Sequence, residues 1–424
     1  MRPDKRIDRT NWSDKVIVIQ ETPVIAKTEK TTVLLLASAQ ALFQTAAVMV
    51  MTISALVGFA LAPNKALATL PIALMTLSTA AMMIPAALLM RRYGRKAGFI
   101  TGAVFGSIAG LLAASAVVAG SFWVFVAANM LVGAYQAFAQ YYRFAAADAA
   151  SADFKSRAVS WVIAGGVVAA VAGPNIARFT EGIGPAPFAA SFLAMTALGL
   201  AAIAIISRLS LAREAAADSA GVAERPLREI ARQPVFLTAV AISAVGFAVM
   251  IMVMTATPLA MRHHGHDTGS AATVIQWHVL GMFVPSFFTG NLIRRFGVLR
   301  IASAGALIII AHIGIALSGA AFLHFLSGLI LLGIGWNFLF IAGTTLLTDA
   351  YRPSERFKAQ ATHDFVMFGA VATASFSSGA LLDAFGWTAV NLAALPFLVL
   401  ILVAIAGYGI ASRRAPLAHR SNAR

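Results

Sequence analysis

Apolar runs of about twenty residues or more recur along nearly the whole chain, and no other sequence feature constrains the fold so strongly. A helix of that length crosses a hydrocarbon layer of about 30 Å. Barrel strands would alternate polar and apolar residues, and these runs do not. We therefore predict an all-α integral membrane protein with twelve transmembrane helices, over residues 32–62, 66–90, 97–119, 122–147, 158–179, 186–207, 235–260, 271–290, 301–319, 322–348, 359–381 and 388–411.

The composition excludes the main alternatives to a membrane protein. Charged residues make up 12% of the 424 residues, apolar residues make up 59%, and the mean hydropathy is +0.82. So few charges cannot cover the surface of a soluble protein of this size, which excludes a soluble enzyme and a disordered regulator. Cysteine is absent, so the chain has neither a disulfide framework nor thiolate chemistry.

The basic residues predict the orientation. Of the 32 Lys and Arg residues, 28 fall on one side of the predicted spans, Arg143 lies within a span, and the other side carries Lys65, Arg178 and Arg262. By the positive-inside rule, both termini are cytoplasmic in a multi-pass protein of the cell inner membrane. The net charge of +15 then faces lipid headgroups, and no nucleic-acid partner is expected. The first thirty residues lack a signal-peptide pattern, so we expect the first span to act as the insertion signal.

The two halves of the chain repeat each other. Arg91-Arg92-Tyr93-Gly94 recurs 203 residues later as Arg294-Arg295-Phe296-Gly297, and Phe154-Lys155 recurs at the same displacement as Phe357-Lys358. Duplicated six-helix units are typical of alternating-access carriers. We predict two pseudo-symmetric six-helix bundles, with a tail at 1–30, bundles at 31–207 and 235–411, a charged linker at 208–234 and a tail at 412–424.

This combination of twelve helices, a repeat, a charged linker and a basic loop after helix two resembles the major facilitator superfamily over residues 31–411. The superfamily's loop reads roughly G-x-L-a-D-r-x-G-r-k, and it is matched here by Leu89, Arg92, Gly94, Arg95 and Lys96. The resemblance implies a carrier whose halves rock about a central site. Both copies of the loop carry Arg where the signature has Asp, at Arg91 and Arg294, which puts the family's charge latch in doubt.

Amide side chains mark a candidate binding surface on the first and fourth predicted helices. At 100° per residue, Asn129, Gln136, Gln140 and Arg143 fall in one narrow wedge, and Gln40 and Gln44 share a similar wedge on helix one. Small polar residues also pack helices in lipid, so helix packing is the alternative interpretation. Amides are costly to bury, and we favour a wet cavity for Gln40, Gln44, Asn129 and Gln136.

Other candidate substrate-binding residues are Trp277 and His278 on helix eight, and Trp336 and Asn337 on helix ten. A lone intramembrane His is either a hydrogen-bonded packing residue or a proton-coupling group. Tryptophan faces and amide edges suit an aromatic, hydrogen-bonding solute. We find no carboxylate deep in any span, and the cavity is expected to be neutral apart from Arg143.

The candidate gating and coupling residues lie near the cytoplasmic ends of the helices: Arg91, Arg92, Asp148, Arg294, Arg295, Asp349, His363 and Asp364. Arg143 either forms a structural ion pair with Asp148 or serves substrate or gating. Asp364 either complements the helix dipole at the start of helix eleven or pairs with Arg91 or Arg92 across the halves.

The run His263-His264-Gly265-His266-Asp267 resembles a metal box, but it has no second cluster and is interpreted as a solvated turn. We predict no metal, no cofactor and no catalytic residues, and no Walker sequence is present. The chain is expected to act as a monomer on a small-molecule substrate.

The predicted activity is secondary active transport of a small, neutral, aromatic solute. The stretch Gln140-Tyr141-Tyr142-Arg143-Phe144 and the expected lining resemble a bacterial facilitator group that includes riboflavin importers. The alternative is efflux of drugs or metabolites by proton antiport, which Gly173-Pro174 favours because it partly matches an exporter signature on helix five. Neither a catalytic constellation nor a signalling domain is visible, so no enzyme is expected.

Overall fold

The computed structural model describes residues 23–64, 67, 70–210 and 224–421. All regular structure in these ranges is helical, as predicted. The first half holds α1 (Pro23–Leu61), α2 (Leu70–Tyr93), α3 (Arg95–Val118), α4 (Phe122–Ala139), α5 (Tyr141–Asp148), α6 (Lys155–Thr180) and α7 (Ala189–Ser207). After α8 (Leu227–Ala231), the second half holds α9 (Pro234–His263), α10 (Thr268–Phe283), α11 (Ser286–Phe296), α12 (Val298–Ser318), α13 (Phe322–Leu347), the short 3-10 helix η2 (Pro353–Glu355), α14 (Arg356–Leu392) and α15 (Leu395–Ser421).

These helices form twelve membrane spans in the described part of the chain. Ten segments are long and apolar enough to cross a membrane, and the bent pair α10–α11 makes an eleventh. One of the ten covers 60 residues, which is about 90 Å of helix and far more than one bilayer. It is interrupted at Gly386, where φ is +77°, so it provides two spans. The predicted number of helices is confirmed.

Two spans differ from the single straight helices that were predicted. The eighth span bends by 41° between α10 and α11, because Pro285 has no N–H to donate to the preceding turn. The fourth span contains a turn at Gln140 between α4 and α5. The first helix begins at Pro23, nine residues before the predicted span, while the rest of the predicted tail lies outside the described residues.

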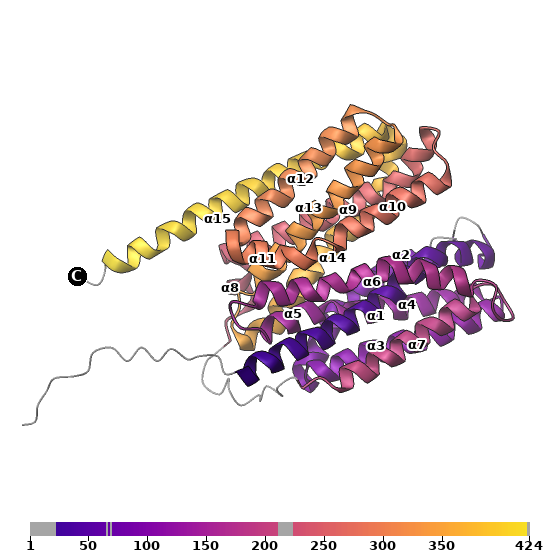
Figure 1. Ribbon diagram of the computed structural model, residues 1–424, viewed down its shortest axis with the longest axis horizontal. Coiled ribbons are helices and arrows are strands. Elements are labelled where there is room, and N and C mark those ends of the chain that lie inside the picture. The colour runs from indigo at the N-terminus through magenta and orange to yellow at the C-terminus, as the bar shows by residue number, and fades with distance from the viewer. Residues whose placement is uncertain (1–22, 65–66, 68–69, 211–223, 422–424) are drawn as a thin grey trace, which may run out of the picture.

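The helices form two bundles that lie side by side, α1 to α7 in one and α9 to α15 in the other (Figure 1). Helices α2 and α6 of the first bundle pack against α14, α10 and α11 of the second. We call the end of the molecule that carries α8 the linker end, and the opposite end the far end. The ribbons of the two bundles converge at the linker end (Figure 1).

Candidate functional site

The bonds that join the two bundles within the described residues lie toward the linker end. Ser156 at the start of α6 donates to the Gly290 carbonyl of α11, at 2.9 Å. Glycine is needed at position 290, because a Cβ there would approach the Ser156 carbonyl to 2.7 Å. This close backbone approach holds α6 and α11 together.

A buried ion pair joins the bundles at the centre of this region. Nη2 of Arg143, on α5, lies 2.6 Å from Oδ1 of Asp364, on α14. The Arg143 side chain is 3% exposed and that of Asp364 is 0% exposed. Arg143 also donates to Gln140 and lies over the rings of Phe144 and Phe340, at 4.6 and 4.5 Å. A charge in this setting is stable only with such partners.

His363 completes the group. Its Nδ1 lies 2.8 Å from Oδ1 of Asp364, and its ring packs edge-on against Phe144. Nε2 of His363, Oδ2 of Asp364 and Nε of Arg143 are buried and have no hydrogen-bond partner among the described residues. We call Arg143, His363 and Asp364 the buried triad.

Both sequence-based pairings for these residues are wrong. Arg143 does not pair with Asp148, and Asp364 does not pair with Arg91 or Arg92. Asp364 also does not open its helix. Because η2 leads into α14 at Arg356, Asp364 lies about two turns inside, where the partner bundle covers it. The expectation that no span contains a deep carboxylate is therefore wrong.

Aromatic side chains from the second bundle surround Phe340 beside the triad. The indole of Trp336 stacks on Phe340 at 4.8 Å with an interplanar angle of 14°. Phe247 packs edge-on against Trp336, Phe340 and Phe368. The indole nitrogen of Trp336 is buried without a hydrogen-bond partner in the described chain. We call Phe247, Trp336, Phe340 and Phe368 the aromatic cluster.

The amides predicted on helices one and four belong to the first bundle. Gln40 donates to Gln44 at 3.2 Å, and both are half-buried. Gln136 is half-buried and accepts a long hydrogen bond from Thr79 at 3.5 Å. Asn129 is fully buried, receives a hydrogen bond from Ser54 at 3.1 Å and donates to the carbonyl of Phe125. The Asn129 amide therefore joins α1 to α4.

The other predicted binding residues lie apart from the aromatic cluster or serve helix packing. Asn337 is fully buried and holds the α10–α11 bend, because it donates to Met282 and Ser286 and accepts from Thr289. His278 is buried and its Nδ1 lies 2.8 Å from the carbonyl of Leu329. Its neighbour Trp277 is 50% exposed.

A second polar network lies next to the triad on the linker side. Arg95 of α3 contacts Asp148 at 2.5 Å and Gln360 of α14 at 3.3 Å. Gln360 donates to Tyr351 at 2.7 Å, and Tyr351 donates to Asp148 at 3.2 Å. Asp148 thus joins α3, α5 and α14.

The remaining predicted gating residues are exposed at the linker end. Asp349 lies 3.9 Å from Lys155, with 62% of its side chain exposed. Arg92 and Arg295 lie over the rings of the neighbouring Tyr93 and Phe296, and Arg294 is exposed. These contacts do not connect them with the triad.

The linker residues before α8 bind both bundles. Glu224 contacts Arg91 of α2 at 2.9 Å and Lys358 of α14 at 3.0 Å. Arg225 binds Glu355 of η2 through Nε and Nη2, at 2.9 and 2.6 Å. These hydrogen bonds raise the pKa of the Arg225 guanidinium, so it stays charged.

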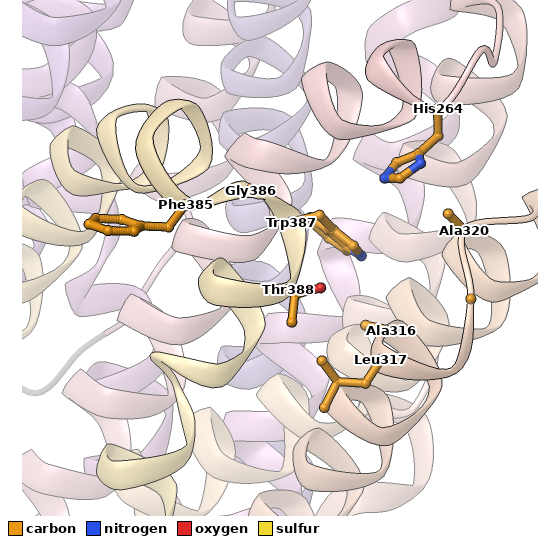
Figure 2. A pocket seen from close by; sticks show the side chains of 9 residues that line it. His264, Ala316, Leu317, Ala320, Phe385, Gly386, Trp387 and Thr388 are labelled. Atoms are coloured by element: carbon orange, nitrogen blue, oxygen red, sulfur yellow. The ribbon is translucent and has the colours of Figure 1, made fainter.

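A separate pocket of about 390 Å³ lies at the far end of the second bundle. His264, Ala320 and Trp387 line it beside the Gly386 break, and Phe385 points away from them (Figure 2). Asp267 from the same His-rich run caps α10 by accepting from the Ser270 N–H at 2.6 Å. Within the described residues, no group of three or more His, Cys, Asp or Glu side chains is arranged to hold a metal.

Several residues of these networks were not predicted from the sequence: Arg95, Glu224, Arg225, Phe247, Phe340, Tyr351, Glu355, Gln360 and Phe368. Arg95 matched the loop signature and was not assigned a role. Phe340 lies four residues after the predicted binding residue Trp336, so the same face of that helix could have indicated it.

Known proteins share this sequence pattern and fold. The profile of the Major Facilitator Superfamily matches residues 34–318 and 254–424. The chain is 45% identical over 374 residues to Riboflavin transporter RfnT of Brucella anthropi, covering 88% of this chain and 94% of that relative. It is 30% identical over 359 residues to Uncharacterized MFS-type transporter YdeG of Bacillus subtilis, covering 80% and 83%.

The solved structures that resemble the chain share its fold at low sequence identity. The Major Facilitator Superfamily transporter FucP, in the outward conformation, gives a TM-score of 0.70 at 18% identity, covering 89% of this chain and 98% of that chain. A bacterial homologue of the iron transporter ferroportin, in an outward-facing state, gives 0.67 at 13% identity, covering 90% and 99%.

Proposed function

The chain belongs to the Major Facilitator Superfamily, and from that premise we propose that it imports riboflavin, or a closely related flat heteroaromatic solute, by alternating access. The observation that carries this proposal is the 45% identity to a riboflavin transporter over 94% of that relative's length. Residues 31–207 and 235–411 are the two rocking units, and the chain carries out transport without chemical conversion.

The chemistry around the triad supports this substrate class. Flat rings stack on aromatic side chains, and the polar edge of a heteroaromatic ring accepts and donates hydrogen bonds. The aromatic cluster offers ring faces, with Trp336 and Phe340 already stacked. Arg143 lies on Phe340, and the half-buried amides of Gln40, Gln44 and Gln136 belong to the opposite bundle. We propose that the solute lies between these two surfaces.

The proposed orientation places the linker end in the cytoplasm, because the basic loops gather there. The inter-bundle bonds at that end then correspond to a conformation closed toward the cytoplasm. Separation of the triad and of the Arg95–Asp148–Gln360 network would open the cytoplasmic side. We assign the gating role to these two groups. Arg91 and Asp349 form exposed ion pairs that support the closed conformation only weakly.

Growth of a riboflavin auxotroph that lacks its own importer tests the proposal. Expression of this chain should restore growth at low external riboflavin, and right-side-out vesicles should take up labelled riboflavin. A failure to rescue, together with accumulation in everted vesicles, would instead indicate an exporter.

The sequence feature that favoured export has a packing explanation. A Cβ at Gly173 would approach Cβ of Val48 on α1 to 3.0 Å. Gly173 therefore lets α6 pack closely on α1, and Gly173-Pro174 gives no separate support for export.

A further inference from the structure

The ion pair between Arg143 and Asp364 is joined through one atom of each group. Nη2 of Arg143 contacts Oδ1 of Asp364 at 2.6 Å, and Nδ1 of His363 contacts the same oxygen at 2.8 Å. Nε of Arg143 and Oδ2 of Asp364 are buried and have no hydrogen-bond partner among the described residues. A guanidinium and a carboxylate frequently form two parallel hydrogen bonds. This pair forms one, so it keeps a free donor and a free acceptor on two groups that are in contact.

The two free atoms define what can bind beside them. A buried polar group without a partner is unfavourable, and native structures rarely leave one unsatisfied. Nε–H of Arg143 needs an acceptor, and Oδ2 of Asp364 needs a donor. An anionic ligand offers acceptors alone and is repelled by Asp364, whereas an ammonium group offers donors alone and is repelled by Arg143. A ring amide meets both needs from one edge, because its carbonyl group and its N–H are adjacent.

The side chains around the pair suit a flat ring. The guanidinium of Arg143 lies 4.5 Å from the centroid of the Phe340 ring, and Trp336 stacks on Phe340 at 4.8 Å. Aromatic side chains favour such contacts with other flat groups. Residues 31–61 of α1 and all of α13 contain no Asp, Glu, Lys or Arg. Arg143 and Asp364 therefore supply the charged groups beside these two helices.

Phe247 is the ring of the aromatic cluster that is open to approach. It is half-buried and lies 5.7 Å from Phe340, whereas the other three rings of the cluster are buried. Gln44, at the corresponding position of the first bundle, is half-buried as well. The free atoms of Arg143 and Asp364 are themselves buried. A solute that arrives past Phe247 therefore reaches them after a neighbouring side chain rotates, and such rotations are common on binding.

We propose that Arg143 and Asp364 recognise the ring-amide edge of the solute, an inference that rests on the proposed import of riboflavin. The isoalloxazine ring of riboflavin carries such an edge, where N3–H lies between two carbonyl groups. Oδ2 of Asp364 accepts from N3–H, and Nε of Arg143 donates to a neighbouring carbonyl oxygen. The two partners belong to different bundles. The recognition surface is therefore complete while the linker end is closed, and separation of the bundles divides it and releases the solute.

Binding of two flavins to the purified protein tests this. Riboflavin and N3-methylriboflavin differ at the atom that Asp364 would contact, and quenching of flavin fluorescence measures the dissociation constant of each. We expect wild-type protein to bind N3-methylriboflavin about 10- to 100-fold more weakly, because methylation removes a hydrogen bond to a charged group and leaves Oδ2 unpaired. Lumiflavin, which has a methyl group in place of the ribityl chain, should show a similar ratio to its own N3-methyl derivative.

The ratio of the two dissociation constants separates recognition from structural damage, because damage weakens both flavins together. Arg143→Met combined with Asp364→Leu removes the pair without leaving an unpaired buried charge, and the ratio should fall to within about threefold of unity. Asp383→Asn is the matched control, because Asp383 is an exposed acid on the same helix, and its ratio should equal that of the wild type.

A wild-type ratio below about twofold would mean that no hydrogen bond is made to N3–H and would overturn the proposal, whether or not the double variant folds. An unchanged ratio in a folded double variant would also overturn it. In both cases riboflavin still binds, and the proposed import stands. Wild-type protein that binds neither flavin would overturn the proposed import, and this inference with it.

Discussion

The two bundles share a backbone frame and differ in the side chains that they present to each other. Gly94 and Gln44 of the first bundle correspond, 203 residues later, to Gly297 and Phe247 of the second. The two glycines have φ values of +86° and +87°, so both copies of the loop make the same turn. The amide at position 44 has become a ring at position 247.

The same displacement relates the rest of the aromatic cluster to small residues. Trp336, Phe340 and Phe368 correspond to Gly133, Ala137 and Gly165. The charges are also divided, because Arg143 corresponds to Leu346 and Asp364 to Trp161. An exact duplicate of the first half would carry tryptophan at position 364 and would leave the buried Arg143 without a carboxylate, which is unfavourable. The turn glycines are required by backbone geometry in both copies, whereas the facing side chains were free to become complementary.

Reversal of one charge of the pair breaks this complementarity and should have the largest effect. Arg143→Asp places two carboxylates together, and Asp364→Arg places two guanidinium groups together. An uncompensated buried charge costs about 3–5 kcal/mol, so each variant should lose most of its membrane abundance and riboflavin exchange. The double variant restores opposite charges and should recover both measurements above either single variant.

Arg91→Asp provides the comparison for an exposed pair. Arg91 is 53% exposed where it meets Glu224, and such a pair contributes less than about 1 kcal/mol. Its abundance should stay close to that of the wild type. A double variant of Arg143 and Asp364 no better than the single variants would show that opposite charge is not what this interface requires.

Substitutions in the two facing surfaces should separate their contributions to binding. Trp336→Ala removes a stacking face worth about 0.5–1.5 kcal/mol together with the apolar area that the indole would bury, so the half-saturation concentration for riboflavin uptake should rise roughly tenfold. Gln136→Ala removes one neutral hydrogen-bonding group worth about 0.5–1.5 kcal/mol, and the rise should be smaller. Uptake kinetics normalised to membrane abundance measure both.

Trp336→Phe controls for the cavity that alanine leaves, since it keeps a ring and should retain most of the affinity. Unchanged half-saturation in Trp336→Ala and Gln136→Ala would assign these residues to helix packing. A larger effect at Gln136 than at Trp336 would reverse the proposed division between an aromatic and an amide surface.

The spans could be predicted from the sequence because apolar length is a local property. The predicted span 97–119 and helix α3 (Arg95–Val118) agree within two residues. The bend at Pro285 was missed, because proline inside an apolar run does not show whether neighbouring helices will support a break. In this protein Asn337 supplies that support from α13.

The candidate site could be predicted only in part, because helical periodicity gives a face but not what the face meets. Gln136 and Asn129 share a wedge, yet the amide of Asn129 is used between α4 and α1 within one bundle. Asp364 is buried for two reasons. The helix α14 begins at Arg356, directly after η2, so Asp364 lies about two turns inside it, and the other bundle covers that part of the helix. The pairing with Arg143 joins residues 221 positions apart. Such a contact is tertiary and has no signal in spacing.

Substitutions at the turn glycines that both bundles share should have the smallest effects, and these effects on stability should be equal in the two bundles. Gly94 and Gly297 combine a positive φ with ψ values of 158° and 151°, a region that is essentially restricted to glycine, so Gly94→Ala and Gly297→Ala should each cost about 1–3 kcal/mol. A Cβ at either position would have no atom within 4 Å, so the cost is backbone strain alone and should be the same in both bundles. Thermal unfolding of the detergent-solubilised protein measures it, with Gly314→Ala as a control inside a helix, where alanine has equal space and no strain. If the two variants lose different amounts of thermal stability, the two bundles differ in backbone conformation as well as in the side chains that face each other. Equal losses, with Gly314→Ala unaffected or slightly stabilised, would confine the asymmetry of this protein to the side chains that meet between its halves.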